Sequence, residues 1–147
     1  MNPASPARRG AATLVDVLLV VVPYALALNG GMPDPVRVAA AAAVLFALAA
    51  QAWLLASRAQ TAGKIWFHQR VARRATGENP GFLIGAIARP FAAWGPNLLC
   101  LYFHALPVWL LLDALFMIRR EDGLSLHDLL CGTRVVGTDS PLTDSAR

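Results

Sequence analysis

The sequence is short of charge. Only 15% of its 147 residues are Asp, Glu, Lys or Arg, whereas a soluble domain carries about a quarter. Hydrophobic residues make up 56% of the chain, and the mean hydropathy is +0.50. So few charges cannot cover the surface of a soluble domain, and so many apolar residues exclude a disordered chain. Because the apolar residues form long runs, we expect them to face lipid.

The sequence also lacks the usual signals of catalysis and metal binding. Its two cysteines, Cys100 in an apolar run and Cys131 in a polar segment, do not form a disulfide framework. No zinc-ligand spacing joins the histidines and cysteines. Gly63 and Lys64 are not a phosphate loop, because the upstream glycine is missing and Ile65 replaces the required Ser or Thr. We therefore expect no enzyme, no metal and no cofactor.

Basic residues flank the apolar runs and give the chain a net charge of +4. Arg8 and Arg9 precede the first run, a cluster at 58–74 follows the second, and Arg119 and Arg120 follow the last. This is the pattern of cytoplasmic loops in membrane proteins. We expect the basic loop, Lys64 included, to contact anionic lipid headgroups. Nucleic acid is not an expected partner, since no aromatic residues interleave with the charges.

The runs and their polar borders divide the chain into segments of one membrane domain. They are a cytoplasmic N-terminus (1–10), a first span (11–28), a second span (36–57), a basic cytoplasmic loop (58–80), an apolar segment (81–118), and a cytoplasmic tail (119–147) that is disordered after 139.

Two interpretations remain open for residues 81–118, an apolar segment interrupted by prolines. It forms either a helical hairpin of two short membrane-embedded helices, or an interfacial helix followed by one span. The hairpin is favoured because it returns Arg119 and Arg120 to the inner side. The predicted fold is thus an all-α polytopic bundle of about four membrane-embedded helices, with three spans plus an interfacial helix as the alternative. Both termini are then cytoplasmic.

Several motifs resemble the RDD family of small bacterial membrane proteins. They run in order from Arg9 to Val136: RGAATLVD, QTAGK, Arg70-Val71, Arg89 and LHDLLCGTRVV. The family is named for one arginine and two aspartates, which correspond here to Arg9, Asp16 and Asp128. The resemblance implies a multispanning protein of the bacterial inner membrane that transports an unidentified ligand, and cation/proton antiport has been proposed for some members. It also suggests a short β pair, 69–72 with 133–136, although Ala72 and Pro90 depart from the family pattern.

Charged residues inside the apolar runs need a partner or a purpose, because an unpaired charge in lipid costs several kcal/mol. For Asp16 the preferred partner is Arg89, and the pair would fix helix packing or carry a proton or cation. Asp113 either reaches the headgroup zone or has a buried role. Asp128 is expected to meet Arg9 as a latch between the chain ends, or to cap nearby backbone amides.

Two function classes follow from these residues. The first is a transporter or ion-permeation protein, oligomeric because about four short helices form a thin wall, with Asp16, Arg89 and Asp113 as coupling residues. The second is a non-transporting module that binds or stabilises another membrane protein. The partners expected are the lipid bilayer, a second copy, or another membrane protein. The candidate residues are Arg9, Asp16, Thr61, Gly63, Lys64, Arg89, Asp113, His127, Asp128, Gly132 and Thr133.

Overall fold

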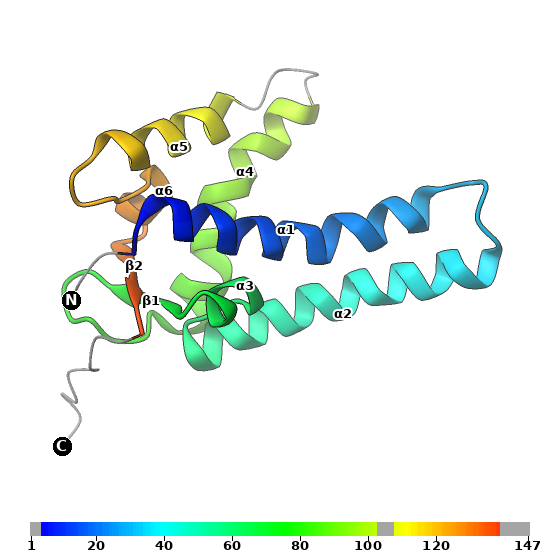
Figure 1. Cartoon of the computed structure of the whole chain (residues 1–147), viewed down its shortest axis with the longest axis horizontal. Coiled ribbons are helices and arrows are strands. Elements are labelled where there is room, and N and C mark those ends of the chain that lie inside the picture. Colours follow the sequence, from blue (N-terminus) through cyan, green and yellow to red (C-terminus); the bar gives the residue numbers. More distant parts are fainter. Residues whose placement is uncertain (1–3, 103–107, 139–147) are drawn as a thin grey trace.

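A long helical hairpin dominates the computed structural model, which describes residues 4–102 and 108–138 (Figure 1). Helix α1 (Pro6–Leu28) packs against α2 (Asp34–Arg58). Ser5 caps α1 by accepting a hydrogen bond from a backbone amide of the first turn, and proline occupies the first helical position. Helix α1 therefore starts within the predicted polar N-terminus (1–10), and Arg9 is a helix residue.

Both helices are long and apolar enough to cross a membrane. Their most apolar 18-residue windows have mean hydropathies of 2.2 and 2.1, yet only 6% and 11% of these windows are buried inside the protein. At 1.5 Å per residue, either helix exceeds the roughly 30 Å of bilayer hydrocarbon. These helices fit the predicted spans 11–28 and 36–57, and their outward apolar surface fits a membrane protein.

A small polar cap covers the hairpin end that holds the start of α1 and the end of α2 (Figure 1). We use "polar cap" for helix α3 (Ala62–Trp66), strand β1 (Gln69–Arg73), helix α6 (Leu126–Leu130) and strand β2 (Thr133–Gly137). The two strands pair antiparallel, with Gln69 opposite Gly137 and Arg73 opposite Thr133. This confirms the predicted β pair and extends each strand by one residue. Val71 of β1 packs on Leu55 and Ala59 at the end of α2, which attaches the cap to the hairpin.

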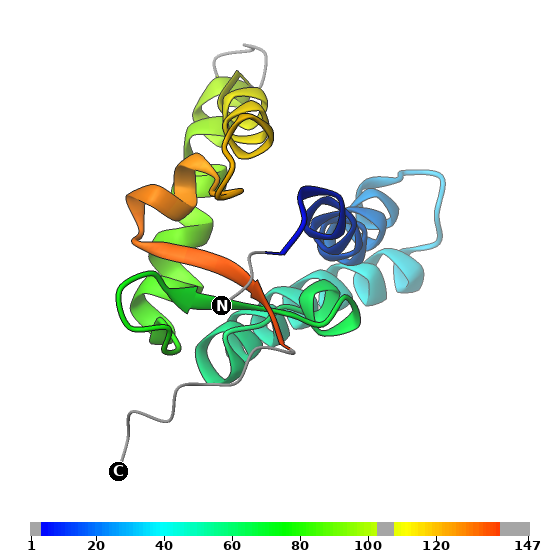
Figure 2. The ribbon, with the colours of Figure 1, turned by 60° about the vertical axis from the view of Figure 1, so that its left-hand side comes forward.

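The segment predicted at 81–118 contains three helical elements. A π-helix, η1 (Phe82–Ala88), leads into α4 (Arg89–Tyr102), and α5 (Val108–Arg119) packs on α4. The Trp109 indole donates a hydrogen bond of 2.9 Å to the Ala92 carbonyl oxygen. Figure 2 shows α4 and α5 together, directed away from the α1–α2 hairpin. With 12 residues, α5 is shorter than the roughly 20 of a membrane span. Among the described residues only α1 and α2 are long and apolar enough to cross a membrane, so four membrane helices are not confirmed.

The predicted tail, 119–147, supplies α6 and β2 to the polar cap. The amide of Ala4 donates to the carbonyl of Val135, at 3.2 Å, so the start of the described chain lies beside β2. The disorder predicted after 139 lies outside the described residues.

Candidate functional site

Asp128 is the centre of a buried charge network. Its side chain has no exposed surface, and Arg9 and Arg89 are only 7% and 8% exposed. Arg9 donates to Oδ2 of Asp128, while Nε and Nη2 of Arg89 donate to Oδ1 at 3.0 and 2.8 Å. The hydroxyls of Ser125 and Thr133 donate to the same carboxylate at 2.9 and 3.1 Å. A buried carboxylate needs such charge-assisted bonds to remain ionised.

Four separate segments contribute to this network. Arg9 comes from α1, Arg89 starts α4 where the π-helix ends, Asp128 lies in α6, and Thr133 begins β2. Ser125 caps α6 by accepting a bond from the Asp128 amide. Burial disfavours the charge of Asp128, but Arg89 and Arg9 outweigh it and hold its pKa well below its usual range. The network thus joins both ends of the chain and the start of α4.

The predicted latch between Arg9 and Asp128 is present in the structure. The predicted contact between Asp16 and Arg89 is wrong, because the Arg89 guanidinium bonds to Asp128. Sequence spacing showed that Asp16 needed a partner but did not show which loop folds over it.

Asp16 is held by a second group of residues, which comes from α2 and from the start of α3. Gln51 Nε2 and the Gly63 amide donate to its Oδ1 at 3.0 and 2.7 Å. The Thr61 hydroxyl donates to its Oδ2, and the ammonium of Lys64 lies 3.8 Å from the same oxygen. Three neutral donors and one cation therefore hold the acid of the first apolar run.

Gly63 is required because α3 lies directly on α1. A Cβ atom at this position would stand 2.1 Å from the carbonyl oxygen of Ala12, which is itself fully buried. Only glycine lets the two backbones approach so closely. The motifs containing Ala12 and Gly63 thus form one contact between helices.

Lys64 is buried, at 8% exposure. The expectation that it faces lipid headgroups is wrong, because its ammonium points to Asp16 and to the Thr61 hydroxyl, 3.4 Å away. Burial, with a smaller contribution from the positive charge of Arg89, lowers the pKa of Lys64 to about 8, although Asp16 and Asp128 oppose the shift. Lys64 therefore loses its proton more readily than an ordinary lysine.

Asp113 and His127 form a third polar contact, which joins α5 to α6. The Asp113 carboxylate accepts the His127 backbone amide at 3.0 Å and lies 2.9 Å from the ring Nδ1. Asp113 thus has a partner in α6, and its position relative to the headgroup zone stays a prediction. His127 Nε2 lies 3.7 Å from Asp128, so this pair borders the first network.

Gly132 forms the turn between α6 and β2. Its φ of +62° lies in the left-handed region that favours glycine. Its carbonyl accepts the Arg74 amide at 2.8 Å, which places the turn beside the end of β1. Gly132 thus positions Thr133 for its bond to Asp128.

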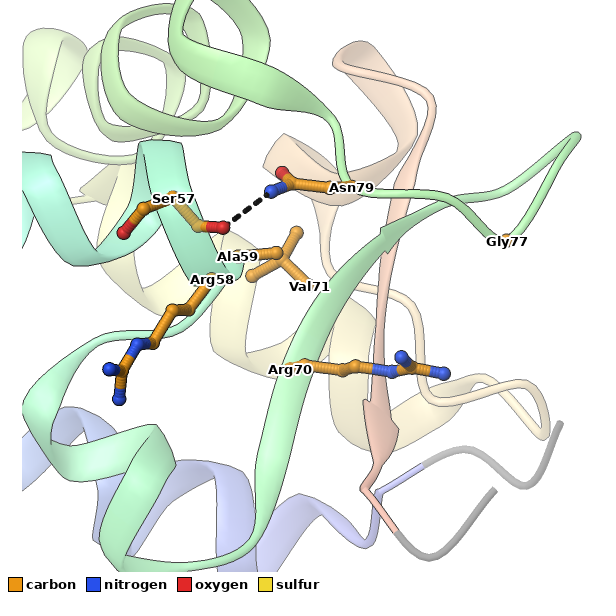
Figure 3. Close-up of a pocket in the computed structure, with 7 residues that line it drawn as sticks. All are labelled: Ser57, Arg58, Ala59, Arg70, Val71, Gly77 and Asn79. Carbon is orange, nitrogen blue, oxygen red and sulfur yellow. Dashed lines mark hydrogen bonds between the residues drawn. The ribbon is translucent and has the colours of Figure 1, made fainter. Parts of the chain in front are cut away.

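A cavity of about 210 Å³ lies where α2 meets β1 (Figure 3). Val71 and Ala59 line it side by side, and Arg58 and Arg70 point in different directions. The Asn79 amide is committed to the carbonyls of Ala56 and Ser57, at 3.1 and 3.3 Å. None of the residues that hold Asp16 or Asp128 lines this cavity. We assign no chemistry to it.

Sequence reasoning missed two residues of the networks. Gln51 is a polar residue within an apolar run, and that isolation was the available signal. Ser125 stands three residues before Asp128, which is the spacing of a helix N-cap. The Ser125 signal pointed to a partner three residues away, whereas the partner of Gln51 lies 35 residues away in sequence.

Comparison with known proteins agrees with the motifs. A model of the RDD family matches residues 3–132, most of the chain. No curated protein and no solved structure gives a significant match.

Proposed function

The chain belongs to the RDD family, and on that premise we propose that it moves an ion or small ligand across the membrane. The coupling proton is exchanged at the buried pair of Asp16 and Lys64. The observation that carries the proposal is the Lys64 ammonium, 3.8 Å from a carboxylate of the first apolar helix, with a pKa of about 8. A buried ionisable pair of this kind is what a proton relay needs.

The two buried networks have different roles in this proposal. Asp128 is bonded by two arginines and stays ionised at any physiological pH, so it serves as a latch. Lys64 has one carboxylate neighbour, and its pKa is lowered to about 8. Coupling therefore belongs to Asp16 and Lys64, and the earlier assignment of Arg89 to coupling is replaced.

The proposed location is the bacterial inner membrane, with the polar cap and both termini in the cytoplasm. A contact between Arg9 and Asp128 requires an even number of crossings between them. The exposed arginines Arg58, Arg73 and Arg74 lie in or next to the polar cap, at the end of α2 and at the end of β1, which fits an inner side. Two long helices enclose no pathway alone, so we propose that transport requires a homo-oligomer.

A non-transporting module is the second candidate, in which the chain binds or stabilises another membrane protein. It is favoured by the exposed apolar surface of α2, where Val38, Leu45 and Phe46 are 69%, 70% and 77% exposed. Such side chains serve a neighbouring helix as well as lipid.

The substitution Asp16→Asn distinguishes the two candidates. The purified chain is reconstituted in proteoliposomes, and proton flux is followed with an internal pH dye after a Na⁺ or K⁺ gradient is imposed. We expect flux from the wild type and none from Asp16→Asn, with the oligomer unchanged in size-exclusion chromatography. Asparagine keeps the acceptor for the Gly63 amide but cannot carry the charge.

Asp34→Asn is the matched control, since this acid is exposed at the far end of the hairpin and pairs only on the surface, with Arg37. It should transport like the wild type. Transport is contradicted if the wild type moves no protons under either gradient, or if Asp16→Asn moves them at the wild-type rate. A loss of partner recovery without any flux defect would favour the module.

A further inference from the structure

We propose that α3 is an interfacial anchor, and that its outer face contacts the headgroup region of an anionic phospholipid leaflet. The inference rests on membrane insertion and does not depend on transport. Helix α3 has two faces. Gly63 and Lys64 are buried against the hairpin, whereas Ile65 and Trp66 are 38% and 77% exposed.

The exposed side chain of Trp66 fits a position at the membrane interface. Indole combines an apolar ring with one N–H donor, and it concentrates where hydrocarbon meets headgroups. Gly63 of α3 lies on α1 at Ala12, and Phe67, which follows Trp66, accepts a bond from Arg8, so Trp66 lies beside the first turns of α1. From Ala12 to Leu28 the helix measures roughly 25 Å, close to the roughly 30 Å of bilayer hydrocarbon. Trp66 thus stands at the level where the hydrocarbon ends.

Two exposed arginines close to α3 fit contact with an anionic leaflet. Arg8 is exposed, and its Nη2 donates to the Phe67 carbonyl at 3.1 Å, so its guanidinium lies at the end of α3. A guanidinium has five N–H donors, and this bond uses one. The others suit the oxygens of a lipid phosphate. Arg58 adds a second exposed cation where α2 ends.

The depth of α3 is measured with a spin label at Ile65→Cys, with Trp66 retained and Cys100 and Cys131 replaced by alanine. The chain is reconstituted in vesicles of phosphatidylglycerol and phosphatidylcholine, and accessibility to oxygen and to a water-soluble nickel complex gives the depth. Two matched labels calibrate the scale: Phe46→Cys, an exposed position in the middle of α2, and Thr76→Cys, an exposed turn of the basic loop.

The label at residue 65 is expected between the two calibrants, at the depth of the lipid phosphates. Trp66→Ala should shift it toward water. The anchor is overturned if the label is as accessible to nickel as the label at 76, or as deep as the label at 46.

Arg8→Gln tests the charge component separately. In the wild type, removing phosphatidylglycerol should move the label at 65 outward, and Arg8→Gln should abolish that dependence on lipid charge. Equal depth in anionic and neutral vesicles for the wild type would exclude anionic headgroups as the partner.

Discussion

The backbone of Gly63 lies against the backbone of Ala12, so closely that a side chain would reach 2.1 Å from the Ala12 carbonyl oxygen. This contact brings the Gly63 amide to Asp16 and buries Lys64 beside it. One glycine thus sets the geometry of the acid in the first apolar helix.

Gly63→Ala is therefore expected to displace α3 from α1. The collision with backbone should lower the free energy of unfolding by about 1 to 3 kcal/mol or more, seen as a lower midpoint of thermal unfolding in detergent. Gly10→Ala is the control, because its Cβ meets nothing within 4 Å and alanine favours a helix. Equal midpoints for the two variants would refute the close contact.

Asp128→Asn is expected to destabilise the fold far more than other acid-to-amide changes. It leaves the buried cations Arg9 and Arg89 without a counter-charge, and breaking a buried pair costs about 3 to 5 kcal/mol. Asp122→Asn, at a partly exposed acid that pairs with Arg120, should cost little. Thermal unfolding of both variants at pH 7 measures the difference, and a similar small loss in each would contradict the buried latch.

The latch also predicts how stability responds to acid. Because the folded pKa of Asp128 lies below its unfolded value of 3.8, its contribution is complete above about pH 4 and declines as pH falls further. The unfolding midpoint of the wild type should approach that of Asp128→Asn as pH falls from 4 toward 2. A difference between the two unfolding midpoints that stays constant from pH 4 to pH 2 would contradict the ionised latch.

Lys64 predicts a response of the same sign, in the basic range. Its folded pKa of about 8 lies below the ordinary 10.5, so the unfolded chain binds the proton more tightly. The contribution of Lys64 to stability therefore rises between about pH 8 and 10.5. Lys64→Met should lose this rise, which is measured as the difference in unfolding midpoints between pH 7 and pH 10. A wild type and variant with parallel profiles would show that Lys64 is not buried.

The two apolar helices could be predicted from sequence, because long apolar runs carry their own signal. The β pair could be predicted only through the resemblance to the RDD family. The latch of Arg9 with Asp128 could also be predicted, since a charged residue near each chain end needed a partner on the same side. The way in which Gln51 and the start of α3 surround Asp16 could not be predicted from the sequence. The partners of Asp16 lie 35 to 48 residues away, and no helical periodicity links one loop to one face of a distant helix.

The burial of Lys64 could not be predicted from the sequence for a related reason. A lysine in a basic loop normally faces solvent or headgroups, and only the contact of Gly63 with Ala12 turns it inward. The partner of Asp113 was missed because it lies in the polar tail, 14 residues along the chain, where α6 folds back on α5.

The central claim is that both ends of the chain meet on the inner side of the membrane, where Arg9 holds Asp128. The most direct test fuses a reporter after Arg147 that is active on only one side of the membrane, with a matched fusion in the turn 29–33. We expect a cytoplasmic C-terminus and an external turn. A C-terminus outside the cell, with the turn also outside, would contradict the central claim, because the latch could not then form.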